Sequence, residues 1–357
     1  MGARAGAGRT TTIALDAMGG DGGTAVVVAA ARRFLAASRT GRRGRGSPVR
    51  LLLVGDPEVI AGHVGADPLP PERVEVVPAD QVVTMEDGAA VALRSKKRSS
   101  MRLAVDAVKD GRADACVSSG NTGALMAISK FVLKTLPGID RPAIAATIPA
   151  IGGHTHMLDL GANVDCTSDH LYQFALMGSI LASAVDGPLR ADGWTPRVGL
   201  LNIGSEDIKG NEQVKRVAPL LAAAPINYIG FVEANDIYTD RVDVVVCDGF
   251  VGNVSLKTSE GVARMVSHHL KAEFTRTLPN RLVGLLARPV MKAFRARFDP
   301  RVYNGATLVG LRGVVVKSHG GADEIALANA LRIAALEIEE DVPGTIRRQL
   351  DAVMDAA

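Results

Sequence analysis

The stretch Asn202-Ile-Gly-Ser-Glu-Asp-Ile-Lys-Gly-Asn211 joins an expected strand to an expected helix. The apolar run 197–203 is typical of a buried strand, and residues 212–224 are typical of a helix that Asn211 caps. In open α/β sheets, ligands bind at such strand-to-helix turns. The free N–H groups of the helix and the charge of Lys209 would attract an anion there. A solvated turn with a capping asparagine is the alternative explanation.

Four other turns repeat this pattern. Strands are expected at 12–15, 113–117, 157–160 and 242–247, turns at 16–23, 118–123, 161–165 and 248–253, and helices from 24, 124, 168 and 255. Each turn combines glycine, which lets a ligand approach the backbone, with Asp, Asn or Ser, which cap helices. Five such turns at the carboxyl ends of apolar strands predict one composite cleft for a polar or anionic ligand.

The composition is that of an α/β protein. The chain has 357 residues, 38 of them glycine, and a net charge of +3. Short continuous apolar runs such as 51–54 are typical of parallel strands covered on both faces. Their alternation with helices predicts a doubly wound, mostly parallel sheet with helices on both faces. We expect residues 1–10 to form a disordered extension and residues 11–345 a single catalytic domain, with two lobes as an alternative. Nothing indicates nucleic-acid binding.

Several motifs are absent from the sequence, which narrows the chemistry. It lacks GxGxxG in a strand–helix context, GxxxxGK[ST] and GxSxG, which disfavours a nicotinamide site, a P-loop ATPase and an α/β-hydrolase. His154 and His156 would face the same side of a strand, but the sequence suggests no third ligand. We therefore expect structural histidines, no metal and no cofactor.

The cysteines and the apolar runs indicate the compartment. Cys116, Cys166 and Cys247 lack CxxC spacing and are expected to be small buried thiols in a reducing cytoplasm. Residues 1–9 carry no apolar segment typical of a signal peptide. No apolar run reaches the ~18 residues that a helix needs to span a bilayer.

Ordered sequence blocks cover nearly the whole chain, from residue 13 to about 330. They read Ala14-Leu-Asp-Ala-Met-Gly-Gly-Asp21, Ser99-Ser-Met101, Gly120-Asn-Thr-Gly-Ala-Leu-Met126, Gly138-Ile-Asp-Arg-Pro-Ala143, Leu158-Asp-Leu-Gly-Ala-Asn163, Leu200-Leu-Asn-Ile-Gly204, Lys209-Gly-Asn-Glu212 and Val244-Val-Val-Cys-Asp-Gly-Phe-Val-Gly-Asn253. In this order they closely resemble the PlsX family, the bacterial phosphate acyltransferases of phospholipid synthesis. Two positions depart from the family pattern. Gly22-Gly-Thr24 replaces the usual His-Ala-Pro, so no histidine role carries over to position 22, and Asn304-Gly305 replaces the usual Gly-Gly.

The resemblance implies a reaction in which acyl-[acyl carrier protein] and inorganic phosphate give acyl phosphate and free carrier protein. It also implies a homodimer and a fold like phosphotransacetylases and the isocitrate and isopropylmalate dehydrogenases. Phosphate is already a nucleophile at neutral pH and needs no strong base. The site must instead offset charge repulsion, align phosphate with the thioester carbon and stabilise a tetrahedral oxyanion.

This reaction suggests roles for the residues of the five turns. Lys209 is expected to neutralise phosphate or the oxyanion, and Asn253 to donate a hydrogen bond to either; these two are the expected catalytic residues. The aspartates are expected to orient donors, because a bare carboxylate beside phosphate is unfavourable, although turn capping alone explains them equally well. The residues expected to bind phosphate or substrate are Asp16, Gly19, Gly20, Asp21, Ser118, Ser119, Gly120, Asn121, Thr122, Asp159, Asn163, Asp248 and Gly252.

The segment 274–298, within an expected helical tip at 270–298, is rich in both apolar and cationic residues. On a helical wheel, one arc holds Arg281, Arg288, Lys292 and Arg295, and another face holds Leu282, Leu286, Val290 and Phe294. Pro289 is expected to break the segment into two helices, which weakens this phase argument. An ordinary surface helix or a dimer contact is one explanation. An amphipathic tip on an anionic membrane surface is the other, and the resemblance favours it.

A membrane-surface tip would suit a product that passes to a membrane acyltransferase, namely one that uses acyl phosphate and glycerol 3-phosphate. The sequence therefore favours a cytoplasmic enzyme peripherally associated with the inner face of the cell membrane. Two other functions stay open from sequence. One is a phosphate acetyl- or butyryltransferase that uses a coenzyme A thioester. The other is a non-catalytic scaffold at the lipid surface, which intact Lys209 and Asn253 argue against.

Overall fold

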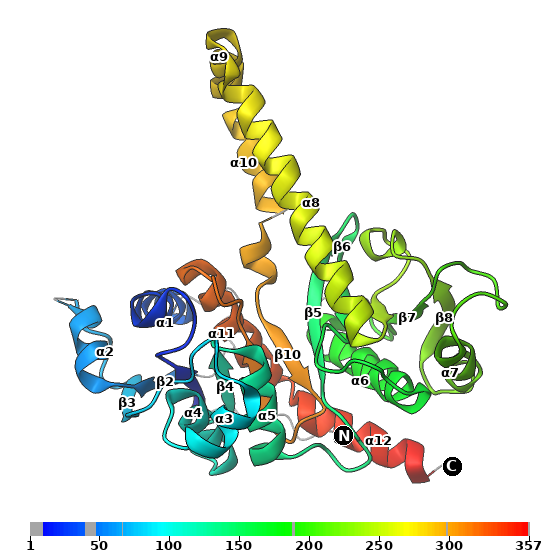
Figure 1. Ribbon diagram of the computed structural model, residues 1–357, viewed down its shortest axis with the longest axis horizontal. Helices are drawn as coiled ribbons and strands as arrows, with labels where there is room; N and C mark the ends of the chain where they lie inside the picture. Colours follow the sequence, from blue (N-terminus) through cyan, green and yellow to red (C-terminus); the bar gives the residue numbers. More distant parts are fainter. Residues whose placement is uncertain (1–9, 40–47, 66, 188–189, 298, 356–357) are drawn as a thin grey trace.

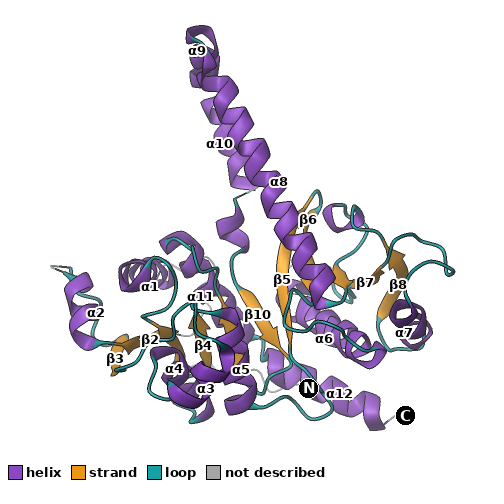
Figure 2. Cartoon of the chain, viewed as in Figure 1, coloured by secondary structure: helices purple, strands orange, loops and turns teal. Residues whose placement is uncertain are grey.

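The structure, a computed structural model, describes residues 10–39, 48–65, 67–187, 190–297 and 299–355 (Figure 1). The disordered extension expected at 1–10 lies outside the described residues, apart from residue 10. Within the described ranges, strands and helices alternate along the chain, and the helices flank a central sheet (Figure 2).

The sheet contains eleven strands within the part of the chain that the structure describes. They are β1 (Thr11–Asp16), β2 (Val49–Gly55), β3 (Val74–Pro78), β4 (Ala115–Ser118), β5 (Ala143–Ala150), β6 (Gly153–Leu158), β7 (Arg197–Leu201), β8 (Asn227–Val232), β9 (Val244–Val246), β10 (Ala306–Val309) and β11 (Val314–Lys317). Their order across the sheet is β3-β2-β1-β4-β11-β10-β5-β6-β9-β7-β8. Most neighbouring pairs are parallel, which confirms a mostly parallel α/β sheet.

Helices cover both faces of the sheet. They are α1 (Gly23–Arg39), α2 (Pro57–Val64), α3 (Ala89–Ser95), α4 (Ser100–Lys109), α5 (Thr122–Leu133), α6 (Ser168–Asp186), α7 (Glu212–Ala222), α8 (Gly249–Arg276), α9 (Leu278–Leu286), α10 (Arg288–Arg297), α11 (Glu324–Glu339) and α12 (Val342–Asp355). Short 3-10 helices lie at η2 (Asp236–Tyr238) and η3 (Pro300–Tyr303).

The first half of the sheet shows why its strands are continuous apolar runs. In β2, alternate side chains enter two different cores. Leu51 and Leu53 pack in the core that contains α1 and α11, while Leu52 and Val54 pack in the core that contains α4 and α5. Because both faces are covered, every position of such a strand gains by being apolar. The second half repeats this arrangement, with α6, α7 and α12 against one face.

The centre of the sheet departs from a uniformly parallel arrangement. Strand β10 runs antiparallel to both β11 and β5, and β5 runs antiparallel to β6. A two-residue turn at 151–152 joins β5 to β6, and so short a turn can only connect antiparallel strands. Strand direction is therefore opposite in the two halves, and the carboxyl ends of β1 and β4 do not share a sheet edge with those of β6, β7 and β9.

The local predictions at the turns hold with small shifts at the ends of elements. Asn211 caps α7, and Asn121 caps α5, which begins two residues earlier than expected. Helix α8 begins at Gly249 rather than Ser255, because Asp248 already accepts a hydrogen bond from the N–H of Phe250.

Helices α8, α9 and α10 extend away from the rest of the molecule (Figure 1). Helix α8 is 28 residues long, and Thr277 caps the start of α9. Helix α9 ends at Leu286 and α10 begins at Arg288, so Pro289 lies in the first turn of α10. The break expected at Pro289 is therefore confirmed next to it, at residue 287, and a second break at Thr277 was not expected, so one helical wheel does not describe 274–298. Among the described residues, no helix is both long and apolar enough to cross a bilayer.

Candidate active site

The first group of candidate residues lies at the carboxyl ends of β1 and β4. The Ser118 hydroxyl donates a hydrogen bond to the Asp16 carboxylate at 2.7 Å and accepts one from the Gly120 N–H at 3.1 Å. The Ser119 hydroxyl donates to the carbonyl of Gly19 at 3.0 Å. These contacts join two loops about 100 residues apart in the chain. Two of the five turns that the sequence assigns to one cleft are therefore in direct contact.

Glycine is required where these loops touch. A Cβ atom on Gly19 would lie 2.6 Å from the Asp16 carboxylate and 2.8 Å from the Gly120 nitrogen. Gly20 has a φ of +85°, and a Cβ atom there would lie 2.6 Å from the Ser119 hydroxyl. Gly19 and Gly20 therefore have a packing role whether or not their N–H groups also contact a ligand.

Lys317, at the end of β11, joins this first group, and the sequence predictions did not include it. Its side chain is buried, with Nζ 3.3 Å from the carbonyl of Ser119 and hydrogen-bonded to the carbonyl of Ser318. Burial lowers the pKa of Lys317 to about 8, although the carboxylates of Asp16 and Asp21 act to raise it. The same burial raises the pKa of Asp16. A buried cation thus lies beside a glycine-rich loop.

The sequence did contain a signal for Lys317. The run Val314-Val-Val-Lys-Ser-His-Gly-Gly321 is an apolar strand followed by Ser and Gly, as in the five predicted turns. The backbone of this turn contacts the first one, because the Asp21 N–H donates to the carbonyl of Gly320 at 2.9 Å. Asn304 holds the turn from the other side, donating to the Ser318 hydroxyl at 2.8 Å and accepting from the His319 N–H at 2.9 Å.

The second group is organised around the buried Asp159, after β6. One carboxylate oxygen accepts the N–H groups of Ile144 at 2.9 Å and Ala162 at 3.0 Å. The other accepts the backbone N–H of Asn163 at 2.7 Å and its side-chain amide at 2.8 Å. Burial raises the pKa of Asp159 even though these hydrogen bonds lower it. Asp159 and Asn163 therefore hold the turn in shape.

Helix α8 begins directly against this turn, and two glycines make that approach possible. A Cβ atom on Gly252 would lie 1.9 Å from the carbonyl oxygen of Asp159. One on Gly249 would lie 2.1 Å from the carbonyl oxygen of Asn163. Because backbone atoms cause both clashes, no side-chain adjustment could relieve them.

Asp248 and Asn253 lie at the start of α8. One oxygen of Asp248 caps the helix at Phe250, and the other accepts the Cys166 N–H at 2.8 Å. The Asn253 side chain is exposed. It lies close to Gly161, because a Cβ atom added to that glycine would be 3.3 Å from the Cβ atom of Asn253. Asp248 therefore orients the backbone, while Asn253 presents its amide at the surface next to the Asp159 turn.

Lys209 lies in an exposed turn after β7. Its Nζ pairs with Glu206 at 2.9 Å, and 43% of its side chain is exposed. Gly210 has a φ of +95°, and a Cβ atom there would lie 2.5 Å from the Asn202 side-chain oxygen. Lys209 is therefore held by a neighbour in its own turn, and an anion would have to displace Glu206 from it.

Asn121 has a structural role that the sequence interpretation did not anticipate. Its side-chain oxygen accepts the Ala124 N–H at 3.0 Å, and its side-chain nitrogen donates to the carbonyls of Met85 at 2.8 Å and Asp87 at 3.1 Å. The amide therefore joins the start of α5 to the loop at 84–87. Both N–H groups of the Asn121 side chain are thus used within the protein, and its expected contact with phosphate or substrate stays a prediction.

Helix α8 brings the two groups towards each other. Lys257 lies four residues after Asn253, so both point from the same face of α8. The positive charge of Lys257 acts on Lys317 and contributes to the lowering of its pKa, after burial. The carboxyl ends of the strands in the two halves lie at opposite sheet edges, and the two halves approach each other through α8. The composite cleft that the five turns predict stays a prediction.

Comparison with known proteins gives the family. A sequence profile described as "Fatty acid synthesis protein" matches residues 11–344. A phosphate acyltransferase from Methylococcus capsulatus is 57% identical over 347 residues, covering 97% of this chain and 98% of the relative. Another phosphate acyltransferase, from Alkalilimnicola ehrlichii, is 54% identical over 351 residues, which cover 97% of this chain and 98% of the relative. The chain belongs to this PlsX family.

Solved structures share the fold of this PlsX-family chain. A phosphotransacetylase from Streptococcus pyogenes aligns over 92% of this chain and 94% of its own, with a TM-score of 0.58 and 17% identity. A branched-chain phosphotransacylase from Enterococcus faecalis V583 aligns over 91% of this chain and 99% of its own, with a TM-score of 0.53 and 13% identity. The expected likeness to phosphotransacetylases is confirmed for the fold.

The three thiols of this PlsX-family chain are buried and free. Burial raises the pKa of Cys166 to about 12, with a further contribution from the Asp248 carboxylate. Burial raises the pKa values of Cys116 and Cys247 as well. All three therefore stay protonated at neutral pH, whereas a nucleophilic cysteine needs the thiolate form.

Proposed function

We propose that this PlsX-family chain converts acyl-[acyl carrier protein] and inorganic phosphate into acyl phosphate and free carrier protein, which feeds bacterial phospholipid synthesis. The observation that carries the proposal is the buried cation of Lys317 beside the loops of Ser118 and Gly19. Glycine-rich loops and a fixed positive charge are suited to phosphate. Family membership supplies the acyltransferase class.

In the proposed reaction a phosphate oxygen attacks the thioester carbonyl carbon. The carbonyl electrons move onto oxygen, and collapse of the tetrahedral intermediate breaks the C–S bond and releases the carrier thiolate. Fixed donors that face the developing oxyanion lower this barrier most effectively. We assign that role to Lys209 and Asn253, and assign phosphate binding to the loops 16–21 and 118–122 with Lys317.

The aspartates have a positioning role in this proposal. Asp16 receives the Ser118 hydroxyl, Asp159 holds the turn before α8, and Asp248 caps α8. None of these carboxylates has to accept a proton from phosphate, because phosphate already carries a nucleophilic oxygen. Direct attack also fits the protonated thiols of Cys116 and Cys247.

We further propose a homodimer that associates with the inner face of the cell membrane through the residues of α9 and α10. Leu282 and Leu286 are 60% and 74% exposed, and Phe294 is 44% exposed. The cationic residues expected to meet lipid head groups are Arg281, Arg288, Lys292 and Arg295. The side chain of Arg295 and residue 298 lie outside the described part of the structure. Product release at the membrane would serve an acyltransferase that uses glycerol 3-phosphate.

The decisive experiment is turnover by the purified full chain, with acyl-[acyl carrier protein] and the matching coenzyme A thioester in parallel. We expect phosphate-dependent formation of acyl phosphate with the carrier-protein thioester at a much higher kcat/KM. A preference for coenzyme A would assign a phosphotransacylase that uses coenzyme A instead. No turnover with either donor would contradict the proposal and favour a scaffold.

A further inference from the structure

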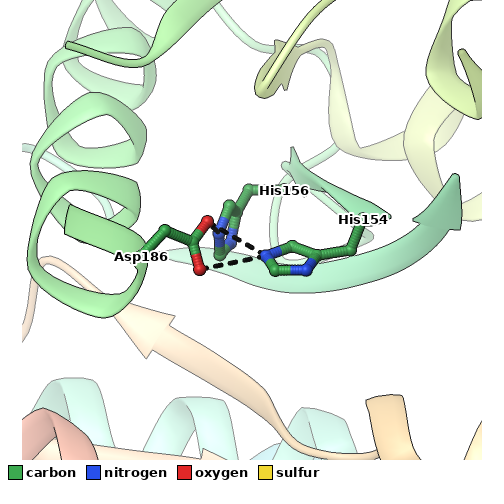
Figure 3. A group of neighbouring side chains, drawn as sticks. All are labelled: His154, His156 and Asp186. Atoms are coloured by element: carbon green, nitrogen blue, oxygen red, sulfur yellow. Dashed lines mark hydrogen bonds and ion pairs between the residues drawn. The ribbon is translucent and has the colours of Figure 1, made fainter. Parts of the chain in front are cut away.

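A cluster of two histidines and one aspartate lies on β6 and at the end of α6 (Figure 3). His154 and His156 are two residues apart on β6, so both rings point to the same face of the strand. Asp186 is the last residue of α6, 30 residues beyond His156 in the chain. The tertiary structure thus adds the third group that the sequence did not suggest.

The three side chains converge on the Asp186 carboxylate. The His156 Nε2 lies 2.9 Å from one oxygen, and the His154 Nε2 lies 3.0 Å from that oxygen and 3.1 Å from the other. All three candidate ligand atoms lie within 4.8 Å of one another. Tetrahedral coordination at ~2.0–2.1 Å places neighbouring ligand atoms roughly 3.3 Å apart, so small side-chain movements would suffice to surround an ion.

A positive charge beside Asp186 would be stabilising because of where Asp186 lies. A carboxylate at the carboxyl end of a 19-residue helix faces the unpaired carbonyls of its last turn, where negative charge is unfavourable. Asp186 is also buried. A cation bound beside Asp186 would balance the charge of this buried carboxylate.

We propose that His154, His156 and Asp186 bind a divalent first-row transition cation, with Zn²⁺ as the best match. Two imidazoles and one carboxylate are a ligand set that Zn²⁺ accepts. The side chains of His156 and Asp186 are nearly fully buried, whereas 29% of His154 is exposed. This leaves an entry path and room for water as a fourth ligand.

The cation would link elements rather than take part in acyl transfer. The histidines are the second and fourth residues of β6 and point to one face of it, whereas Asp159 follows its carboxyl end at the candidate active site. Coordination would fix the end of α6 against the β5–β6 hairpin. Bound cation should therefore raise the thermal stability of the protein and leave the binding of phosphate unchanged.

The test compares the full-length protein with variants of this cluster and of a matched pair. Each protein is treated with a chelator, desalted, loaded with Zn²⁺ alone, and measured for bound metal and for Tm. His154→Gln removes the more exposed ligand, and Asp186→Asn removes a buried one. The control is His268→Gln with His269→Gln, since these adjacent histidines are exposed on α8 with ring centroids 5.5 Å apart.

We expect the wild-type chain to retain about one Zn²⁺ after desalting and to show a higher Tm with Zn²⁺. Each cluster variant should bind at least ~100-fold more weakly, since even second-shell changes cost 10–100-fold. The control pair should behave as wild type. The proposal is overturned if the wild-type protein retains no Zn²⁺, or if His154→Gln retains as much as wild type. It is also overturned if only the control pair loses metal. In those cases the cluster is a hydrogen-bonded pair of histidines on Asp186.

Discussion

The three lysines near the candidate site, two of them assigned to anion binding, differ in how the protein holds them. Lys317 is buried and touches backbone carbonyls, while Lys209 is exposed and paired with Glu206. Lys257 lies on α8 and pairs with Glu260 at 3.0 Å. A buried lysine is fixed before phosphate arrives, whereas an exposed one has to exchange a carboxylate partner for the substrate. We therefore assign phosphate binding to Lys317 and charge stabilisation during the reaction to Lys209.

The first prediction concerns Lys209. Lys209→Ala should lower kcat for acyl phosphate formation by ~10²–10³-fold, the usual effect of losing one oxyanion donor. Glu206→Gln is the matched control, because it removes the partner but keeps the lysine, and it should retain most activity. Steady-state kinetics and gel filtration measure both. Near-normal turnover by Lys209→Ala would remove Lys209 from the catalytic residues.

The second prediction concerns Lys317 and pH. Because burial lowers the pKa of Lys317 to about 8, its charge is present below that pH and is lost above it. We expect kcat/KM for phosphate to fall as pH rises through about 8. In Lys317→Met the value should be low throughout, and this alkaline decline should disappear. An unchanged decline in the variant would assign the titration to another group.

The third prediction concerns the buried thiols. Replacing Cys116, Cys166 and Cys247 by Ala, singly and together, should leave kcat nearly unchanged and lower Tm through lost packing. Mass spectrometry under turnover should detect no acylated cysteine. An acyl-enzyme that one of these substitutions abolishes would contradict direct attack by phosphate.

At the scale of elements, α8 has two roles along its length. Its first turns pack through Gly249 and Gly252 against the candidate site, and its later turns extend outward with α9 and α10 (Figure 1). Gly284 of α9 lies against Phe274 of α8, where a Cβ atom would be 3.1 Å from the ring. Exposed apolar side chains continue along the extension, which is suited to contact with lipid or a second copy of the chain.

The fourth prediction concerns this extension. Leu286→Glu with Phe294→Glu should release the protein from anionic vesicles and leave acyl phosphate synthesis in solution largely intact. Each cation at an anionic surface contributes roughly 1 kcal/mol, so wild-type binding should also weaken with salt. Vesicle sedimentation measures the binding.

The control for the fourth prediction is Val262→Glu with Val266→Glu, an apolar pair on α8 in which each side chain is 50% exposed. It should not affect sedimentation with vesicles. Light scattering should show that the tip variant stays dimeric. If the tip variant dissociates the dimer and still binds vesicles, α9 and α10 are an assembly element.

At the scale of the whole molecule, one buried acid near the antiparallel centre affects stability. Glu337 of α11 hydrogen-bonds to Thr307 of β10, and its other oxygen has no hydrogen-bond partner among the described residues. Burial raises the pKa of Glu337 to about 8. The native state therefore holds this proton at neutral pH, while the unfolded chain releases it near pH 4.5.

The fifth prediction follows from this difference. The contribution of protonated Glu337 to the free energy of unfolding is fully present below pH 4.5. It is lost as the pH rises towards about 8. The loss can reach about 1.4 kcal/mol per pH unit in that window, because the native state binds more protons than the unfolded state. Glu337→Gln should flatten the fall in unfolding free energy between pH 6 and 8, measured by urea denaturation. Parallel curves for the two proteins would show that Glu337 ionises in the native state.

The sequence by itself determined the local structure and the family. Apolar runs bounded by Gly and Asn predicted the strands of both halves, and Asn211 predicted the start of α7, because caps and burial depend on neighbouring residues. The ordered blocks identified the PlsX family. The sequence also assigned Asp16 and Ser118 to one predicted cleft, and the two residues, which end the adjacent parallel strands β1 and β4, are hydrogen-bonded in the structure.

Only the tertiary structure decided how the two halves meet. The antiparallel β10 and the β5–β6 hairpin reverse strand direction, which the apolar runs could not indicate because a buried strand looks the same in either direction. The contacts of the Asn121 side chain with the loop at 84–87 could not be predicted either, because these partners lie 34 or more residues away in the chain. Lys317 and Asp186 gained roles for the same reason, because burial and long-range hydrogen bonds exist only after the chain has folded.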